Sequence, residues 1–406
     1  MSKSRTRLYL LIAMLFSLLP TTGTHAQGDS TSYRVETTRW RSAEDSFASW
    51  RRDRVALASG GALQLDSPKH SGAGATDPHG PRRRGRVSSL VGEAVGPVVT
   101  TSFPFSEAIP SWNAVTPAGT WIEVHLRARA GSDWTRWYNL GVWTSGPDAA
   151  MRHSVEGQAD TGAYVDVDTL KLGQRGKPLT ATAYQLKFRL FSKNSEALPS
   201  VMNAAVVVSS SPRTPATPAP GNPERWGKVL PVPECSQMVY PDGGEVWCSP
   251  TSVSMVLGYW AGRSGPCEPG VRSAVNGVYD RVYEGHGNWP FNAAYAASQG
   301  MEAYVTRFTG MAQAEEWVAA GVPVVMSYSW GRDQLTGAPI PASNGHLAVL
   351  VGFDAQGNPI VNDPAAASNE AVQRTYSRAE LEKLWLQGSG GTVYLIYPMG
   401  RVVPRF

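Results

Sequence analysis

The sequence has 406 residues, with 37 Lys or Arg against 33 Asp or Glu, so its net charge of +4 is small for its length. A chain this long is expected to form more than one domain. The one basic cluster, residues 82–86, follows a Gly/Ser/Pro/His-rich stretch and is expected to be a solvated loop. The charge therefore gives no reason to expect nucleic acid as a partner.

Residues 1–26 have the pattern of a secretory signal peptide. Three basic residues precede the apolar run 8–19, and Thr24-His25-Ala26 forms a small-residue cleavage site. Removing Lys3, Arg5 and Arg7 lowers the basic count from 37 to 34 against 33 acidic residues, which leaves a charge of about +1. No later stretch approaches the roughly 18 apolar residues of a membrane helix. We expect a secreted or periplasmic protein with no integral membrane segment once the signal is removed.

Between residues 32 and 208, short strand-like runs alternate with turn residues. Apolar and polar residues alternate in the runs that begin at positions 121, 137, 163, 183 and 204, and Gly, Pro, Asp and Asn separate them. This spacing predicts an antiparallel all-β sandwich over 32–208, with no long helix inside it.

Five tryptophans lie close together in this region: Trp112, Trp121, Trp134, Trp137 and Trp143. Exposed aromatic rings can stack on sugars, so binding of cell-wall glycan is one hypothesis for this region. Trp121 and Trp143 lie on alternating strand patterns, and Trp134 and Trp137 lie beside a turn. We expect core packing to account for most of these side chains.

The Ser/Pro/Thr/Ala-rich segment 209–224 cannot build a core and is predicted to be an extended linker. Beyond it, residues 225–406 change in pattern to a helix, a loop-rich part and then strands. This order predicts an α+β domain rather than a second sandwich. The chain is thus expected to be multidomain.

Cys248 lies where a loop leads into a predicted helix that ends near Trp260. Pro250 suits a first helical turn, Ser249 or Cys248 itself can act as the cap, and apolar residues recur at helical spacing to form a buried stripe at Val253, Val256, Leu257 and Trp260. Unpaired backbone N–H groups and the helix dipole favour a thiolate at such a position, and the thiolate is the reactive form of cysteine. The alternative is a small buried cysteine that only packs behind the start of the helix.

Three cysteines, Cys235, Cys248 and Cys267, are an odd number for an exported protein, in which paired cysteines tend to oxidise. A Cys235–Cys267 disulfide would leave Cys248 free and reactive. A Cys235–Cys248 pair would instead leave no nucleophile, and the sequence does not decide between the two.

Only two histidines, His286 and His346, follow the linker, and a cysteine nucleophile needs a base whose imidazole is oriented by a third group. His346 begins an apolar strand that ends near residue 353, and a turn leads to a second strand that ends at Asp363. The two strands should form an antiparallel hairpin with His346 and Asp363 towards the same end. Each could also have a local role, His346 as a hydrogen-bonded bystander and Asp363 as a strand terminator. Asn362 is a weaker candidate for the orienting group.

Three motifs in this order resemble the peptidase C39-like family of papain-fold cysteine peptidases: Trp247-Cys-Ser-Pro-Thr-Ser, Gly345-His-Leu-Ala-Val-Leu-Val-Gly-Phe and Val361-Asn-Asp-Pro, preceded by Val232-Pro-Glu-Cys-Ser-Gln. The resemblance covers roughly 225–400. It implies a papain-like fold, with Cys248 as nucleophile, His346 as general base and then acid, Asp363 as its orienting group and Gln237 as an oxyanion-hole donor. Trp247 and Trp289 are expected to line the substrate cleft, and the β-rich region is similar to modules found ahead of such domains.

Two departures bear on these roles. The family often has Cys-Gly-Pro where this chain has Cys248-Ser249-Pro250, and Gln237 lies farther ahead of the cysteine than is usual. The resemblance implies acyl transfer from a peptide or protein substrate to water, with no cofactor. No His-Glu-x-x-His motif or zinc-site spacing predicts a metal, and no Gly-x-Ser-x-Gly motif predicts a serine hydrolase. The competing functions are a non-catalytic envelope or glycan-binding protein and an acyltransferase that forms the same thioester.

Overall fold

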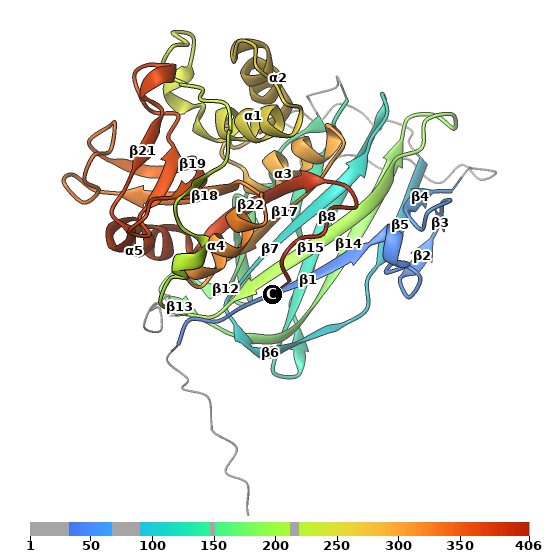
Figure 1. Cartoon of the computed structure of the whole chain (residues 1–406). Helices are drawn as coiled ribbons and strands as arrows, with labels where there is room; N and C mark the ends of the chain where they lie inside the picture. Colours follow the sequence, from blue (N-terminus) through green and yellow to red (C-terminus); the bar gives the residue numbers. More distant parts are fainter. Residues whose placement is uncertain (1–31, 67–89, 147–150, 212–218, 406) are drawn as a thin grey trace, which may run out of the picture. The chain divides into compact units, whose positions relative to one another are not determined.

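The structure is a computed structural model that describes residues 32–66, 90–146, 151–211 and 219–405. The expected signal peptide, the basic cluster and residues 212–218 of the expected linker lie outside the described residues. The described part divides at the linker into an N-terminal region that is rich in strands and a C-terminal region of helices and strands (Figure 1). No helix among the described residues is long and apolar enough to span a membrane.

The N-terminal region contains two antiparallel sheets in its described residues. The first has the order β11 (Ala163–Asp166), β12 (Thr169–Gln174), β7 (Glu107–Val115), β15 (Ser200–Ser209), β4 (Leu63–Leu65) and β3 (Val55–Leu57), with β1 (Val35–Arg41) on β15 and β13 (Lys177–Pro178) on β12. The second has the order β10 (Tyr138–Trp143), β8 (Thr120–Ala130), β14 (Ala181–Ser192), β5 (Leu90–Val95) and β2 (Arg51–Asp53), with β6 (Val99–Phe105) on β14 and β9 (Asp133–Trp134) on β8.

All five strand runs expected between 121 and 208 are present, as β8, β10, β11, β14 and β15. Alternate residues of both sheets enter a shared apolar cluster, for example Trp112 of β7 and Leu126 of β8. No α-helix occurs among the described residues of this region, and η1 (Ser42–Glu44) is a 3₁₀ turn. The prediction of an all-β N-terminal region is confirmed.

The C-terminal region contains one sheet and five helices in its described residues. The sheet has the order β17 (Met301–Arg307), β22 (Thr392–Pro398), β18 (Val324–Trp330), β19 (Ser343–Phe353), β20 (Pro359–Asn362) and β21 (Gln373–Thr375), with β16 (Lys228–Val229) on β19. The helices are α1 (Cys248–Trp260), α2 (Glu268–Val278), α3 (Trp289–Ser298), α4 (Met311–Ala319) and α5 (Arg378–Ser389), and three 3₁₀ turns are η3 (Pro223–Arg225), η4 (Gly244–Val246) and η5 (Asn369–Ala371). The α+β prediction is confirmed.

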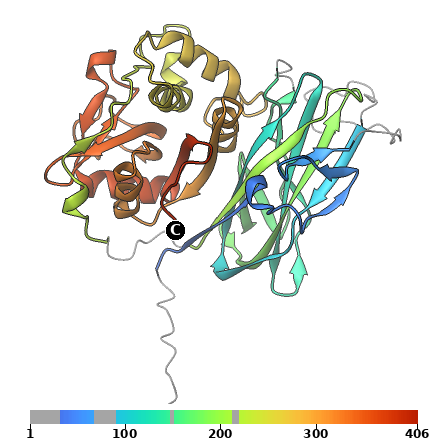
Figure 2. The same ribbon diagram turned by 45° about the vertical axis from the view of Figure 1, so that its right-hand side comes forward.

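Helices cover both faces of this sheet, with α1 and α2 on one side and α4 and α5 on the other (Figure 2). The alternation along β19 explains this arrangement, because successive side chains of a strand point to opposite faces. Val349 and Val351 join the apolar cluster that contains α1, whereas Ala348 and Leu350 join the cluster that contains α4 and α5. A strand that is buried on both faces has a continuous apolar sequence, as this one does.

Helix α1 differs in two ways from the sequence-based expectation. Its N-cap is Trp247, which makes no side-chain capping bond, so neither Cys248 nor Ser249 caps it. It is also buried on nearly all sides instead of along one stripe, because α2, α3 and β19 all pack around it. Within that core, Ser252 Oγ donates to the carbonyl of Leu347 at 3.1 Å.

The N-terminal and C-terminal regions share part of their apolar core, and residues 32–406 form one compact unit. Phe291 of α3 contacts two tryptophans of the N-terminal region, with ring centroids 6.1 Å from Trp112 and 5.3 Å from Trp143. Asn113 of β7 donates from Nδ2 to the carbonyl of Ala303 in β17. The N-terminal region therefore packs directly against β17 and against α3, which in turn contacts α1.

Candidate active site

Cys248 is the first residue of α1 and is partly exposed, whereas the rest of the first turn is buried. As the residue after the N-cap, it lies among the backbone N–H groups that have no partner within the helix. Ser249 follows it with ordinary helical backbone, and its hydroxyl lies 3.0 Å from the hydroxyl of Tyr394. The serine that replaces the family's glycine is therefore accommodated by a buried hydrogen bond.

His346 lies near the start of β19 and is buried. Its Nε2 lies 2.8 Å from Oδ1 of Asp363, and its imidazole is close enough to Cys248 for that side chain to contribute to its pKa. Two aromatic rings meet the imidazole edge to face, Tyr328 at 5.5 Å and Trp330 at 5.3 Å between centroids. Since Nε2 is engaged by Asp363, the nitrogen left for Cys248 is Nδ1.

The hairpin of β19 and β20 explains why Asp363, rather than its neighbour, meets the histidine. Leu350 pairs with Val361 and Val349 pairs with Asn362, and an irregularity interrupts the register next to Gly352. Opposite residues of an antiparallel pair share a face, so Asp363 falls on the His346 face and Asn362 on the other. Asn362 instead donates to the carbonyls of Val232 and Pro233.

Four donors hold the buried carboxylate of Asp363. Oδ1 accepts from His346 and from the backbone N–H of Ala365, and Oδ2 accepts from the hydroxyls of Tyr376 at 2.7 Å and Tyr328 at 3.2 Å. Burial and the Asp363 charge raise the pKa of both tyrosines, so both hydroxyls stay protonated and donate. Burial alone would raise the pKa of Asp363, but the His346 charge and these hydrogen bonds hold it below its usual value.

The same carboxylate controls the protonation of His346. Burial alone would lower the pKa of this imidazole, but the charge of Asp363 and the hydrogen bonds to Asp363 and Cys248 raise it to about 10. A protonated imidazole can give its proton to a leaving group that forms beside it. The arrangement can therefore supply a nucleophile together with a proton donor beside it.

Gln237 lies next to the loop that carries Asp363, because its backbone N–H donates to the carbonyl of Pro364 at 2.8 Å. The long segment between Gln237 and Cys248 folds back as consecutive turns. Gly244 is required there, since a Cβ at this position would lie 2.0 Å from the Gln237 carbonyl oxygen. The Gln237 side chain is 2% exposed and its Oε1 has no hydrogen-bond partner among the described residues.

Trp247 and Trp289, the residues predicted to line the cleft, lie at the starts of α1 and α3. Trp247 is 6% exposed and packs between Tyr240 and His286, at 5.7 Å and 6.2 Å between ring centroids. Trp289 is partly buried at the start of α3. Burial, together with the positive charge of Arg152, lowers the pKa of His286 to about 4, so this second histidine is neutral at pH 7.

Cys235 and Cys267 form a disulfide, which leaves Cys248 as the free thiol. The bridge ties the segment before α1 to the residue that precedes α2. The backbone N–H of Cys235 also contacts Met255 Sδ of α1 at 3.4 Å. The covalent link therefore fixes the approach to the helix that presents Cys248.

Sequence reasoning missed Tyr328, Trp330 and Tyr376. Tyr328 pairs with His346 across β18 and β19, and Tyr376 follows β21. A strand pairing of this kind depends on long-range register, and each residue alone looks like an ordinary core aromatic. No local sequence signal could have identified them.

A cavity of about 350 Å³ lies at the start of β19, where Trp330, Ser343 and Asn344 line it together with the end of α5. Among the described residues, no group of three or more His, Cys, Asp or Glu side chains is arranged to hold a metal ion.

Comparison with known families assigns both regions. Residues 36–209 match the Peptidase C39 N-terminal domain, and residues 229–393 match the Peptidase_C39 like family. No curated protein matches the chain. The second match confirms the family resemblance that the motifs around Cys248, His346 and Asp363 indicate. The chain thus carries a C39-like peptidase region, preceded by a region that matches the N-terminal domain of such peptidases.

Proposed function

We propose that the protein is an exported cysteine peptidase with a papain-like catalytic domain that hydrolyses peptide or amide bonds through Cys248, His346 and Asp363. The observation that carries the proposal is the meeting of three side chains from separate elements. A partly exposed free thiol begins α1, the imidazole of β19 is near enough for the thiol to influence its pKa, and the carboxylate after β20 holds the imidazole. In this proposal Cys248 is the nucleophile, His346 is the base and Asp363 is the group that orients the base.

Catalysis begins from the thiolate and imidazolium pair. The Cys248 sulfur attacks the carbonyl carbon of the scissile amide, and the carbonyl oxygen takes up the negative charge. His346 then gives its proton to the leaving amine, and a thioester remains on Cys248. Neutral His346 next removes a proton from water, which attacks the thioester and releases the acid. Asp363 keeps its proton state throughout and holds Nε2, so that Nδ1 stays directed to the sulfur.

The oxyanion requires donors near Cys248. The backbone N–H of Cys248 is one, because the first residues of a helix have no intrahelical acceptor for their amides. The Gln237 amide is the second in this proposal, and the contact of Gln237 with Pro364 and Gly244 supports its placement. Each such donor contributes about 3 to 4 kcal/mol to the transition state.

Export is part of the proposal. The Cys235–Cys267 disulfide supports it, because disulfides persist in oxidising compartments outside the cytoplasm. Expression of the full chain in a bacterial host, followed by mass analysis of the N-terminus in each cell fraction, tests it. Processing after Ala26 with recovery outside the cytoplasm agrees with the proposal, and an unprocessed cytoplasmic chain contradicts it.

Glycan binding by the N-terminal region has no comparable support. The partly buried Trp134 and Trp137 each carry a cation on a ring face, with Arg127 at 4.4 Å and 4.6 Å from their centroids and Lys187 at 4.6 Å from Trp137. Trp112, Trp121 and Trp143 are buried in the core. A peptide or protein substrate is therefore the partner that we propose.

The test is digestion of a diverse peptide library with the mature protein and with Cys248→Ala, read by mass spectrometry. We expect new peptide termini with the wild type and none with the variant. Ser210→Ala, at a partly buried position outside the catalytic group, serves as the matched control and should cut normally. Equal cleavage by Cys248→Ala contradicts the proposal, and products that form only with an added amine indicate a transferase.

A further inference from the structure

The loop of residues 279–289 joins α2 to α3 and borders the catalytic group. His286 in this loop contacts Trp247, the residue before Cys248. Tyr283 is 47% exposed, and burial of its hydroxyl together with negative charge at Asp168 and Cys248 raises its pKa. The tyrosine ring therefore lies at the surface, on a loop that contacts the residue before the nucleophile.

Asp280 gives this loop its shape from inside. Its Oδ1 accepts the backbone N–H groups of Val282 and Tyr283 at 3.1 Å each, and its Oδ2 accepts Asn288 Nδ2 at 2.9 Å. A backbone bridge also links Asp280 to Gly285. The carboxylate is fully buried, so the loop closes around it as a compact turn that presents Tyr283.

The N-terminal region holds the first half of the loop. Ser154 donates to the Asp280 carboxylate from its backbone N–H at 2.9 Å and from its hydroxyl at 3.2 Å. The Arg152 guanidinium donates to the carbonyls of Tyr279 and Asn276, and the Arg152 carbonyl accepts the N–H of Arg281. Arg152 and Ser154 are buried, so these contacts exclude water.

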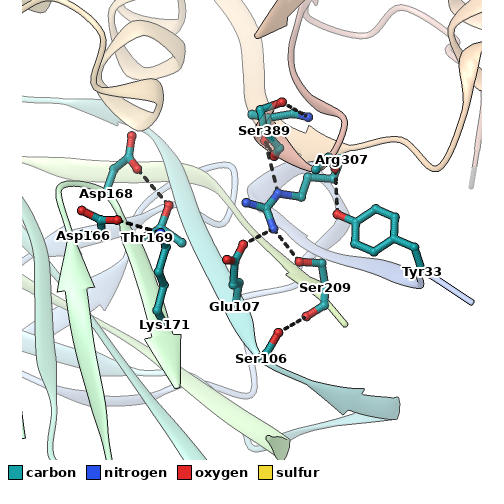
Figure 3. A network of polar contacts seen from close by, with 12 residues as sticks. Tyr33, Ser106, Glu107, Asp166, Asp168, Thr169, Lys171, Ser209, Arg307 and Ser389 are labelled. Carbon is teal, nitrogen blue, oxygen red and sulfur yellow. Dashed lines mark hydrogen bonds and ion pairs between the residues drawn. The ribbon is translucent and has the colours of Figure 1, made fainter. Parts of the chain in front are cut away.

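Asp168 holds the other end of the loop. Its Oδ2 accepts the backbone N–H of Trp289 at 2.8 Å, and its Oδ1 accepts the hydroxyl of Thr169 at 3.0 Å. Figure 3 shows Asp168 beneath a helix of the C-terminal region, with Thr169 beside it. A carboxylate at the first turn of a helix also interacts favourably with the positive end of the helix dipole. Both ends of the loop are thus fastened by side chains of the N-terminal region.

We infer that residues 152–168 of the N-terminal region hold loop 279–289 as one wall of the substrate cleft, and that Tyr283 on this wall contacts the bound peptide and selects it. The inference rests on the proposed peptidase function and deepens it. Asp168 and Arg152 are positioning residues, because they act through the loop. The N-terminal module is then part of the peptidase's specificity rather than a separate binding unit.

Two variant pairs test the inference in the full chain. Tyr283→Ala removes the ring and Tyr283→Phe keeps it, so Ala should lower kcat/KM for the preferred library peptides by about ten-fold or more while Phe retains most of it. Asp168→Ala removes the acceptor for Trp289 N–H, whereas Asp168→Asn keeps an oxygen there. Asp168→Ala should raise KM with little change in kcat, and Asp168→Asn should restore the wild-type KM.

Asn113→Ala is the matched control, because it removes a buried hydrogen bond between the two regions away from this loop. It should leave the peptide preference unchanged. Iodoacetamide is too small to depend on contacts with loop 279–289. It should therefore alkylate Cys248 at the same rate in all five variants and the wild type.

Unchanged kcat/KM across the peptide panel in Tyr283→Ala overturns the role of Tyr283. An equal effect of Asn113→Ala and Asp168→Ala overturns the role of the loop contacts, because any loosening between the regions would then suffice. If Asp168→Ala does not fold, the Tyr283 pair still decides the selection. Failure of the peptidase proposal gives a different result, because Cys248→Ala would then cleave the peptides as the wild type does.

Discussion

The carboxylate of Asp363 accepts four hydrogen bonds, and two of them come from tyrosines that are distant in the sequence. The negative charge of this residue is what keeps His346 protonated against the effect of burial. Asn362, one residue earlier, faces the opposite side of β20, donates to backbone carbonyls of the segment before α1 and accepts from Gln373. The last residue of β20 and the residue after it thus have different roles.

Asp363→Asn should therefore lower kcat by about a hundred- to ten-thousand-fold, because the amide neither carries the charge nor fixes the tautomer of His346. Asn362→Ala is the matched neighbour. It should lower the free energy of unfolding by about 1 to 3 kcal/mol, since it leaves buried carbonyls without a donor, and should keep kcat in the folded fraction. Peptide kinetics and urea unfolding measure both effects. A wild-type kcat in Asp363→Asn contradicts the assignment.

The raised pKa of His346 predicts how the stability of the fold changes with pH. In the folded protein the imidazole pKa is about 10, above its ordinary value of 6.5, so the fold binds this proton more tightly than the unfolded chain does. The stabilisation is complete below about pH 6.5 and is lost as the pH rises through about 10. Thermal unfolding between pH 6 and 10.5 should show this loss in the wild type and much less of it in His346→Gln. Equal slopes in the two proteins are the contrary result.

At the scale of elements, the disulfide and α1 belong together. The Cys235–Cys267 bridge closes a loop with a sequence separation of 32 that contains the whole helix. Loop closure of this length stabilises a fold by about 3 to 4 kcal/mol in the chain-entropy description. The double variant Cys235→Ala/Cys267→Ala should lose stability of this order in urea unfolding. Adding a reductant should then destabilise the wild type and leave the double variant unaffected, and a double variant as stable as the wild type contradicts the expectation.

The elements were largely predictable where a local pattern determines them. Alternation located β8, β10, β11, β14 and β15, and the apolar run after His346 located β19 within three residues at its start. The cap of α1 was not predictable, since it depends on the turn at Gly243 and Gly244. The irregularity next to Gly352 also leaves no sequence signature, yet it contributes to the register that faces Asp363 towards His346.

The residues of the candidate site, like the elements, could be predicted only where a local sequence pattern marks them. Cys248, His346 and Asp363 could be proposed because the second region has one cysteine at a helix start and two histidines. Tyr328 and Tyr376 could not, because only the folded sheet brings their hydroxyls to Asp363. The contacts of Arg152 and Asp168 with loop 279–289 were equally hidden, since they join positions more than 100 residues apart.

At the scale of the whole molecule, a buried polar network joins the two regions. Arg307 of β17 donates to Glu107 of β7 at 2.6 Å and to Ser209 of β15, and Nε donates to Thr392 of β22 (Figure 3). The arginine side chain is almost fully buried. The charge of Arg307 in the C-terminal region is paired with Glu107 in the N-terminal region. Separation of the two regions would therefore leave the arginine charge unpaired or expose it to water.

Glu107→Ala should therefore destabilise the whole chain by about 3 to 5 kcal/mol, the usual cost of removing one partner of a buried ion pair. The double variant Glu107→Leu/Arg307→Met should lose much less, because it removes both charges. Calorimetry together with near-ultraviolet circular dichroism measures the loss and shows whether the regions still unfold in one transition. A single variant no less stable than the double variant contradicts this role for the network.

The most direct test of the central claim is the rate at which iodoacetamide labels Cys248 at pH 6, with the labelled site mapped by mass spectrometry. The account predicts rapid labelling of Cys248 alone in the wild type and a loss of about a hundred-fold or more in His346→Ala, because the imidazolium no longer favours the thiolate. Labelling after denaturation must be equal in both proteins, which shows that the thiol is present in each. Equal labelling of the two folded proteins, or a Cys248 that resists the reagent in the wild type, would contradict the account.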